Sequence, residues 1–316
     1  MTRRFIQPAT ILATAGMALA GASCGDAAAP NPSCSDFPTA PASARVDLGR
    51  PSFSDPTNVT NPLFPISQLA RALLLGNVGG VPLRVETTLL PYTRTIEVNG
   101  RDVETLVSQY VAFLDGRILE VALDWYAQAD DGSVWYFGED VFNYEDGIIV
   151  DTEGTWLAGR DGPVAMIMAA NPQVGNVWRP ENICGLVFEE VTVTSTGVTV
   201  NGPGGPVAGA IVVDELHMDL THEDKIFAPG YGEFSTGSGS DLEAIALAVP
   251  TDALPGPTPA ELGTLSSRAT DVFDAAHAGD WSAASAAVND MTAAWATFQG
   301  GAVPPMLDTQ MDGALA

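Results

Sequence analysis

The sequence has little positive charge. Its 316 residues include 13 Lys and Arg against 39 Asp and Glu, so the formal net charge is −26, and Lys225 is the single lysine. So few cations cannot neutralise a nucleic-acid backbone or attract an anionic lipid surface. The composition therefore argues against nucleic acid as a partner. It also argues against attachment of the protein to a membrane by charge alone.

Catalytic signatures are also scarce. The chain has no Gly-x-Ser-x-Gly elbow, no His-Glu-x-x-His, no phosphate loop and no Cys-x-x-Cys pair, and it has only three histidines. These absences favour a protein that binds rather than catalyses. A hydrolase that works with two carboxylates needs no histidine, so 39 acidic residues leave that alternative open.

The N-terminus has the layout of an export signal. Arg3 and Arg4 precede an uncharged apolar stretch, which predicts a signal peptide over residues 1–23. The segment 19–24, Leu-Ala-Gly-Ala-Ser-Cys, resembles a bacterial lipobox with Gly21 in place of its usual aliphatic residue. We therefore expect a lipid on Cys24 that anchors the protein in the outer membrane, periplasm or cell surface. The alternative is ordinary cleavage after Ala22.

Three cysteines follow or end this signal. If Cys24 carries a lipid, Cys34 and Cys184 remain and can form a disulfide, which would stabilise the fold by closing a long loop. Two free thiols are the alternative.

Three regions follow the signal. Residues 24–45 have almost no large apolar side chain and predict a flexible tether. Residues 46–254 alternate segments rich in Val, Ile, Thr and aromatics with turns such as Asn99-Gly100 and Asp146-Gly147, which predicts a mainly β domain. We expect an antiparallel meander curled into a barrel, half-barrel or sandwich.

The tail, residues 255–316, changes to helical periodicity. Thr258-Pro259-Ala260-Glu261 predicts a capping box, and Gly279-Asp280 predicts the end of one helix and the cap of the next. The apolar residues of each helix, among them Trp281, lie on one seam, so we expect an antiparallel helical hairpin. A third helix from Pro304 either docks on the hairpin, or the bundle is completed by another copy of the chain or by a partner.

Two sets of residues are candidates for a binding site. Trp125, Tyr126, Trp135 and Tyr136 form an aromatic hairpin that could stack on a sugar or apolar ligand, although core packing is favoured. Glu215, His217 and Asp219 alternate with apolar residues on one expected strand. With the apolar residues inward, these three form an outward row that could hold a divalent cation, and a solvated acidic face is favoured over that site.

The motif Asp124-Trp125-Tyr126-Ala127-Gln128 to Val134-Trp135-Tyr136-Phe137-Gly138-Glu139-Asp140 resembles a family of bacterial secreted proteins and lipoproteins without assigned activity. The segments 58–65, 143–147, 153–156, 170–175 and 227–232 are similar to that family in the same order. The resemblance covers about residues 58–249 and implies an exported β domain without a known chemistry.

These observations predict an exported, lipid-anchored envelope protein that binds a small molecule, glycan or protein without catalysis. A carboxylate-based hydrolase acting on glycans and a purely structural adapter are the alternatives.

Overall fold

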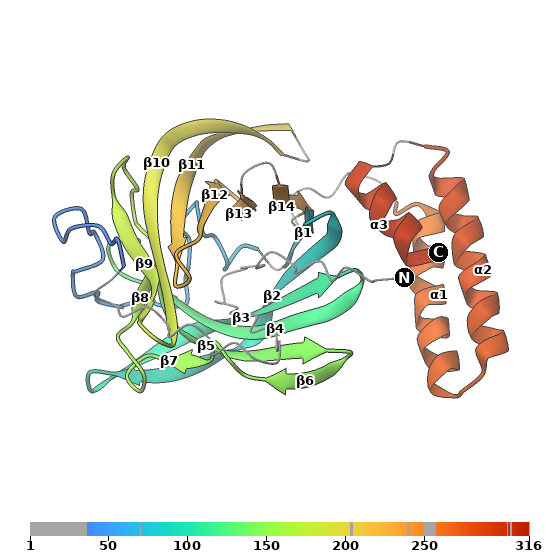
Figure 1. The fold of residues 1–316 in the computed structure, drawn as a ribbon, viewed down its shortest axis with the longest axis horizontal. Helices are drawn as coiled ribbons and strands as arrows, with labels where there is room; N and C mark the ends of the chain where they lie inside the picture. Colours follow the sequence, from blue (N-terminus) through green and yellow to red (C-terminus); the bar gives the residue numbers. More distant parts are fainter. Residues whose placement is uncertain are drawn as a thin grey trace, which may run out of the picture. The chain divides into compact units, whose positions relative to one another are not determined.

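A computed structural model describes residues 37–69, 71–202, 205–238, 241–248, 257–301, 303 and 305–315. The chain forms two compact units, with the boundary between Asp252 and Ala253. The first is a β unit and the second is helical, and each is described by itself (Figure 1).

The β unit consists of antiparallel strands, which confirms the prediction of a mainly β fold. The described strands are β1 (Arg71–Val78), β2 (Val81–Val98), β3 (Arg101–Leu114), β4 (Arg117–Gln128), β5 (Val134–Glu145), β6 (Ile148–Asp151), β7 (Trp156–Leu157), β8 (Ala165–Met168), β9 (Val177–Ile183), β10 (Val187–Gly202), β11 (Gly205–His217), β12 (His222–Ala228), β13 (Gly232–Ser238) and β14 (Asp241–Ala248).

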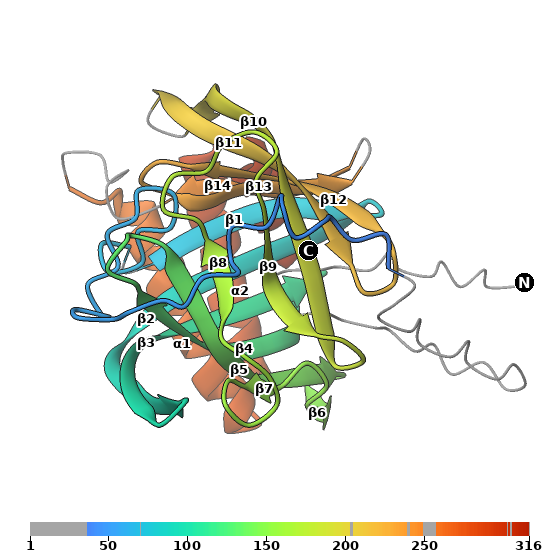
Figure 2. The same cartoon turned by 90° about the vertical axis from the view of Figure 1, so that its left-hand side faces the viewer.

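The strands form two meanders. The first runs β6-β5-β4-β3-β2-β1, with β7 and β8 also paired to β5, and the second runs β13-β12-β11-β10-β9. Strand β14 pairs with β13 and with β1, and register shifts interrupt several of the ladders. Such shifts bend strands, and Figure 2 shows how β9–β11 curve over the sheet of the first meander. Among the described strands β9 pairs with β10 alone, so the path of paired strands is not closed.

The predicted hairpin turns are confirmed. Asn99 and Gly100 have φ of 54° and 75°, and they join Val98 to Arg101 as a two-residue turn. Asp146 and Gly147 repeat this geometry between β5 and β6. Positive φ at both central residues gives the turn the twist that the strands need. A similar turn at residues 115–116 was not predicted.

The C-terminal part of the predicted tether is packed. The Phe37 ring stacks on Phe188 of β10 with 4.7 Å between centroids, and the Val46 amide donates to the Val177 carbonyl of β9. A flexible tether over all of residues 24–45 is therefore wrong for residues 37–45. Cys24 and Cys34 lie outside the described residues, so the disulfide stays a prediction; Cys184 packs against the same apolar cluster as Phe37.

The helical unit contains α1 (Ala260–His277), α2 (Trp281–Phe298) and α3 (Pro305–Leu315), and α1 and α2 form the predicted hairpin. Asp280 caps α2 by accepting from the Ala283 amide at 3.0 Å. The capping box at α1 is wrong, because Pro259 occupies the N-cap position and has no side chain that accepts a hydrogen bond. Trp281 is 69% exposed, so it lies off the buried seam.

The third helix docks on the hairpin, which is one of the two predicted alternatives. The Trp295 indole of α2 donates to Asp312 of α3 at 2.8 Å. Among the described helices, none has the length and apolarity needed to cross a membrane.

Candidate functional site

The aromatic hairpin lies in the core. Trp125, Tyr126, Trp135 and Tyr136 are each at most 4% exposed. The two tyrosine rings stack at 4.8 Å, and the Arg94 guanidinium lies 3.8 Å from the Trp125 ring. Trp125, Tyr126 and Tyr136 therefore pack against protein and offer no exposed face for a sugar, whereas Trp135, although 4% exposed, also lines a cavity of the β unit.

The row that was expected to face solvent faces inward. Glu215 and His217 of β11 are 2% and 3% exposed, whereas Asp219 lies in the turn after the strand and is exposed. The prediction assumed that the apolar residues of this strand, such as Leu216, point inward. Leu216 is buried, but it packs against Phe37 and Phe188 on the outer side of the sheet. Because Phe37 covers Leu216, both faces of β11 are buried at this end of the strand and alternation cannot identify the inner one.

Glu215 and His217 belong to a larger set of inward side chains on the second meander. The strand register brings them together: Glu189 of β10 lies opposite Glu181 on one side and His217 on the other, and Glu215 lies opposite Glu223. Alternate residues of a strand share a face, so neighbouring strands present their charged groups to the same space. The buried polar cluster comprises Glu181 of β9, Glu189 of β10, Glu215 and His217 of β11, and Glu223 and Lys225 of β12.

Two cations lie within this cluster. The Lys225 ammonium is completely buried and donates to Glu215 at 3.1 Å, with Glu223 3.8 Å away. The His217 ring has its Nδ1 3.6 Å from Glu189 and its Nε2 3.7 Å from Glu223, distances of ion pairs rather than hydrogen bonds. The single lysine of the chain thus serves as a counter-ion inside the β unit.

These cations do not satisfy the acids. Both carboxylate oxygens of Glu181 and of Glu189, and both ring nitrogens of His217, have no hydrogen-bond partner in the described structure. With every group ionised, four acids face two bases and leave a net charge of −2. Buried polar groups are nearly always paired, so such unpartnered atoms indicate a missing proton or a bound species.

The first meander adds further acids. Glu139 of β5 is fully buried, without a hydrogen-bond partner, and Glu120 and Asp124 of β4 are 2% and 4% exposed. Gly138 has φ +120°, and a Cβ there would lie 2.2 Å from the Trp156 carbonyl, so only glycine lets β7 pair beside Glu139. Asp124 has a partner, because the Tyr136 hydroxyl donates to it at 2.8 Å.

Burial raises the pKa of most of these acids. Desolvation, reinforced by a neighbouring carboxylate, raises the pKa of Glu120 to about 8 and holds the pKa values of Glu139 and Glu181 well above their ordinary range. Desolvation also raises the pKa of Asp124 to about 7, although the Tyr136 hydrogen bond opposes it. Glu120, Glu139 and Glu181 are therefore largely protonated at neutral pH, and Asp124 is about half protonated.

The pKa values of the groups around the two cations shift in different directions. Burial acts to raise the pKa of Glu189, but His217 and Lys225 outweigh it and lower that pKa to about 2. Burial next to the Glu189 charge raises the pKa of Glu215 to about 8. Burial acts to lower the pKa of His217, yet Glu189 and Glu223 raise it to about 10. In the described structure, the ionised carboxylate of Glu189 thus lies beside the protonated carboxyl group of Glu215.

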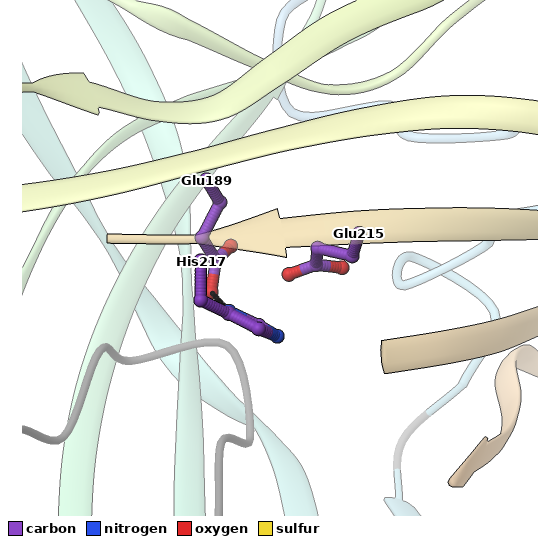
Figure 3. A group of neighbouring side chains, drawn as sticks. All are labelled: Glu189, Glu215 and His217. Atoms are coloured by element: carbon purple, nitrogen blue, oxygen red, sulfur yellow. Dashed lines mark ion pairs between the residues drawn. The ribbon is translucent and has the colours of Figure 1, made fainter. Parts of the chain in front are cut away.

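Three members of the cluster have the geometry of a metal-binding set. Glu189, Glu215 and His217 each offer one ligand atom, and these atoms lie within 4.8 Å of one another. Figure 3 shows Glu215 and His217 from one strand and Glu189 from its neighbour, with Glu189 and His217 in contact. Two of the three predicted ligands are thus brought together, and Asp219 is replaced by Glu189.

A sequence signal for the missed residues existed but was weak. Glu223 and Lys225 are two positions apart on one strand, the same spacing as Glu215 and His217. Glu189 lies in a strand rich in valine. The lone lysine was the best clue, because a chain that retains one ammonium among 39 acids is expected to pair it.

Neither a protein-family model, nor a curated protein, nor a solved structure matches this chain. The predicted family resemblance therefore stays a prediction.

Proposed function

We propose that this protein is an exported, lipid-anchored envelope protein whose β unit, a half-barrel, binds a divalent metal ion without catalysis. The proposed ligands are Glu189, Glu215 and His217. The observation that carries the proposal is that Glu189 and His217 are buried, directed at one another and without a hydrogen-bond partner. The predicted signal peptide and Cys24 lipidation supply the location.

Charge supports the binding of a cation. A coordinating imidazole must be neutral, so the cluster that meets the metal has four carboxylates against Lys225, a formal charge of −3 when the acids are ionised, and a divalent ion would reduce it to −1. A metal would also displace the protons from Glu215 and His217, because a coordinating carboxylate must be ionised and a coordinating imidazole must be neutral. Lys225 competes with the ion for Glu215, which limits the affinity.

The ligand set indicates which ions to test. One imidazole nitrogen with two carboxylate oxygens suits Zn²⁺ or Mn²⁺ better than Ca²⁺, which prefers six to eight oxygens. We therefore expect Zn²⁺ to bind most tightly, Mn²⁺ next and Ca²⁺ weakly.

Isothermal titration of the full mature chain with Zn²⁺ at pH 7 tests the proposal. We expect one ion per chain, and we expect Glu189→Gln and His217→Gln each to weaken binding by about 100-fold, which is about 2.7 kcal/mol. Thermal unfolding of each variant without metal shows whether it is folded.

Asp214 and His222 provide the matched control. They form an exposed Asp–His pair, 2.9 Å apart, on β11 and β12 and on the outer side. Asp214→Asn and His222→Gln should leave Zn²⁺ binding unchanged. If instead these variants abolish binding and Glu189→Gln does not, the ion is held at the surface and the proposal is wrong.

A second candidate function is hydrolysis by a carboxylate pair. One observation favours it: Glu189 and Glu215 have pKa values pushed apart to about 2 and about 8, as a base and an acid require. Against it, both side chains are at most 2% exposed, so a glycan has no access to them in the described conformation. Turnover of an envelope glycan that Glu215→Gln abolishes would favour this candidate over metal binding.

A further inference from the structure

A second site lies apart from the buried polar cluster. A cavity of about 640 Å³ is lined by residues from five parts of the β unit: the segment 45–53, the β2–β3 turn at 98–103, Trp135 and Phe137 of β5, residues 163–165 at the start of β8, and positions 179 and 182 of β9. It shares no residue with the cluster. Its volume is in the range of cavities that bind small organic molecules.

The cavity gathers positive charge in an acidic protein. Arg45, Arg50, Arg101 and Arg179 line it, four of the twelve arginines in the chain, together with only two acids, Asp47 and Asp102. The lining has a formal charge of +2, whereas the whole chain has −26. We call this cavity the arginine pocket.

Two of its arginines have structural partners. Arg45 makes a bidentate ion pair with Asp47 at 2.5 Å, and both side chains are less than 10% exposed. Arg179 donates to Glu190 at 2.9 Å and to Asn182 at 3.0 Å. The Arg179 backbone amide also donates to Asp47 at 3.1 Å, which holds the segment 45–47 against β9 at one wall of the pocket.

The other two arginines are available. Arg50 and Arg101 are exposed, and in the described part of the chain neither forms an ion pair. They come from different segments, Arg50 from the segment 45–53 and Arg101 from the β2–β3 hairpin. Two guanidinium groups on the rim of one pocket can bind a carboxylate with charge-assisted hydrogen bonds.

Part of the remaining lining is apolar, beside the polar residues Ser52, Asn99 and Asn182. Phe53 packs edge-on against Phe137 at 5.4 Å, and Val103 and Val164 lie beside them. Leu48 also lines the cavity and is 58% exposed, so its side chain can contact a bound molecule. An apolar floor under a cationic rim fits a ligand that is itself amphiphilic.

We propose that the arginine pocket binds an organic carboxylate with an apolar body, such as a medium-chain fatty acid or an aryl acid. Arg50 and Arg101 bind the carboxylate, and Phe53, Val103 and Leu48 contact the body. An inorganic anion would leave the apolar floor unused, and an amine would be repelled by the rim. This site is independent of the metal site proposed above.

Titration calorimetry with three probes of equal chain length, octanoate, octylammonium and octanol, tests this proposal on the full mature chain. We expect octanoate to bind one per chain and more tightly than the other two. The double variant Arg50→Gln/Arg101→Gln should weaken octanoate binding by about tenfold or more. It should change octanol binding by less than about twofold, because the floor is intact.

Arg117→Gln is the matched control, because Arg117 is 75% exposed and lies outside the pocket. It should bind octanoate like the wild type. The metal-site variant Glu189→Gln should also retain octanoate binding. A failure of the metal proposal can therefore be distinguished from a failure of the proposal for the arginine pocket. Equal binding of octylammonium and octanoate, or unchanged octanoate binding by the double variant, would overturn the proposal.

Discussion

The buried polar cluster and the arginine pocket carry charge in opposite ways. In the cluster, four acids and two bases are all at most 5% exposed, and Glu181 and Glu189 have no hydrogen-bond partner. In the pocket, Arg50 and Arg101 are exposed, and within the described residues neither is in an ion pair. A buried charge must be compensated by a counter-ion, a proton or a metal, whereas an exposed one is compensated by water.

This difference predicts which substitutions affect the stability of the fold and which affect ligand binding alone. Removing a charge from the cluster leaves its partner buried and uncompensated, so folding and function are coupled there. Removing Arg50 or Arg101 changes what the pocket binds and leaves the fold alone. Arg45 lies between these extremes, because it lines the pocket and yet is paired and nearly buried.

Lys225→Met should have the largest effect on stability. It leaves Glu215 and Glu223 without their ammonium partner, and breaking a buried ion pair costs about 3–5 kcal/mol. We expect urea unfolding to show a loss of this size at pH 7. Adding Glu215→Gln should recover part of it, and full stability in Lys225→Met alone would show that the cluster is not compensated by this lysine.

Arg45→Gln should have an intermediate effect. It breaks the bidentate pair with Asp47, and we expect a loss of about 1–3 kcal/mol in the free energy of unfolding. Urea unfolding measures it. A loss as large as that of Lys225→Met would mean that the pocket wall is as dependent on charge as the interior.

The pH dependence of stability should reveal the protonated acids. Burial next to Asp124 raises the pKa of Glu120 to about 8, above its unfolded value of about 4.5. The folded state therefore binds more protons between these values, so the unfolding free energy falls as pH rises from about 5 to 8.

Replacing Glu120 measures its contribution to the pH dependence of the unfolding free energy. Glu120→Gln should make the slope near pH 6 less negative by up to about 1.4 kcal/mol per pH unit, which is one proton. Urea unfolding at several pH values measures the slope. An unchanged slope would mean that Glu120 ionises in the fold as it does in the unfolded chain.

Arg50→Gln should have the smallest effect, within about 0.5 kcal/mol, because an exposed side chain without an ion pair contributes little to stability. Thermal unfolding checks it. A clear loss of stability would show that Arg50 has a structural partner and would weaken its assignment to ligand binding.

Local signals predicted the fold well. The Asn99-Gly100 and Asp146-Gly147 turns, the helical hairpin and the Asp280 cap depend on neighbouring residues alone, so sequence identifies them. The inward face of β11 depends on what covers its outer side. Phe37, which lies 179 positions before Leu216 in the chain, buries that side, and no periodicity within the strand reports this contact.

The candidate site was predicted only in part for the same reason. Glu215 and His217 share one strand, so their spacing suggested a site. Glu189 reaches them through the β10–β11 register, and Glu181 through the pairing of β9 with β10. The arginine pocket was missed altogether, because its arginines are separated by up to 134 positions and form no sequence motif.

A crystal structure of the protein grown with Zn²⁺, with diffraction recorded on both sides of the zinc absorption edge, tests the central claim most directly. The account predicts one anomalous peak in the β unit, within bonding distance of Glu189, Glu215 and His217, and its loss in Glu189→Gln. A structure without zinc at that position, in which His217 and Lys225 alone compensate the acids, would contradict it.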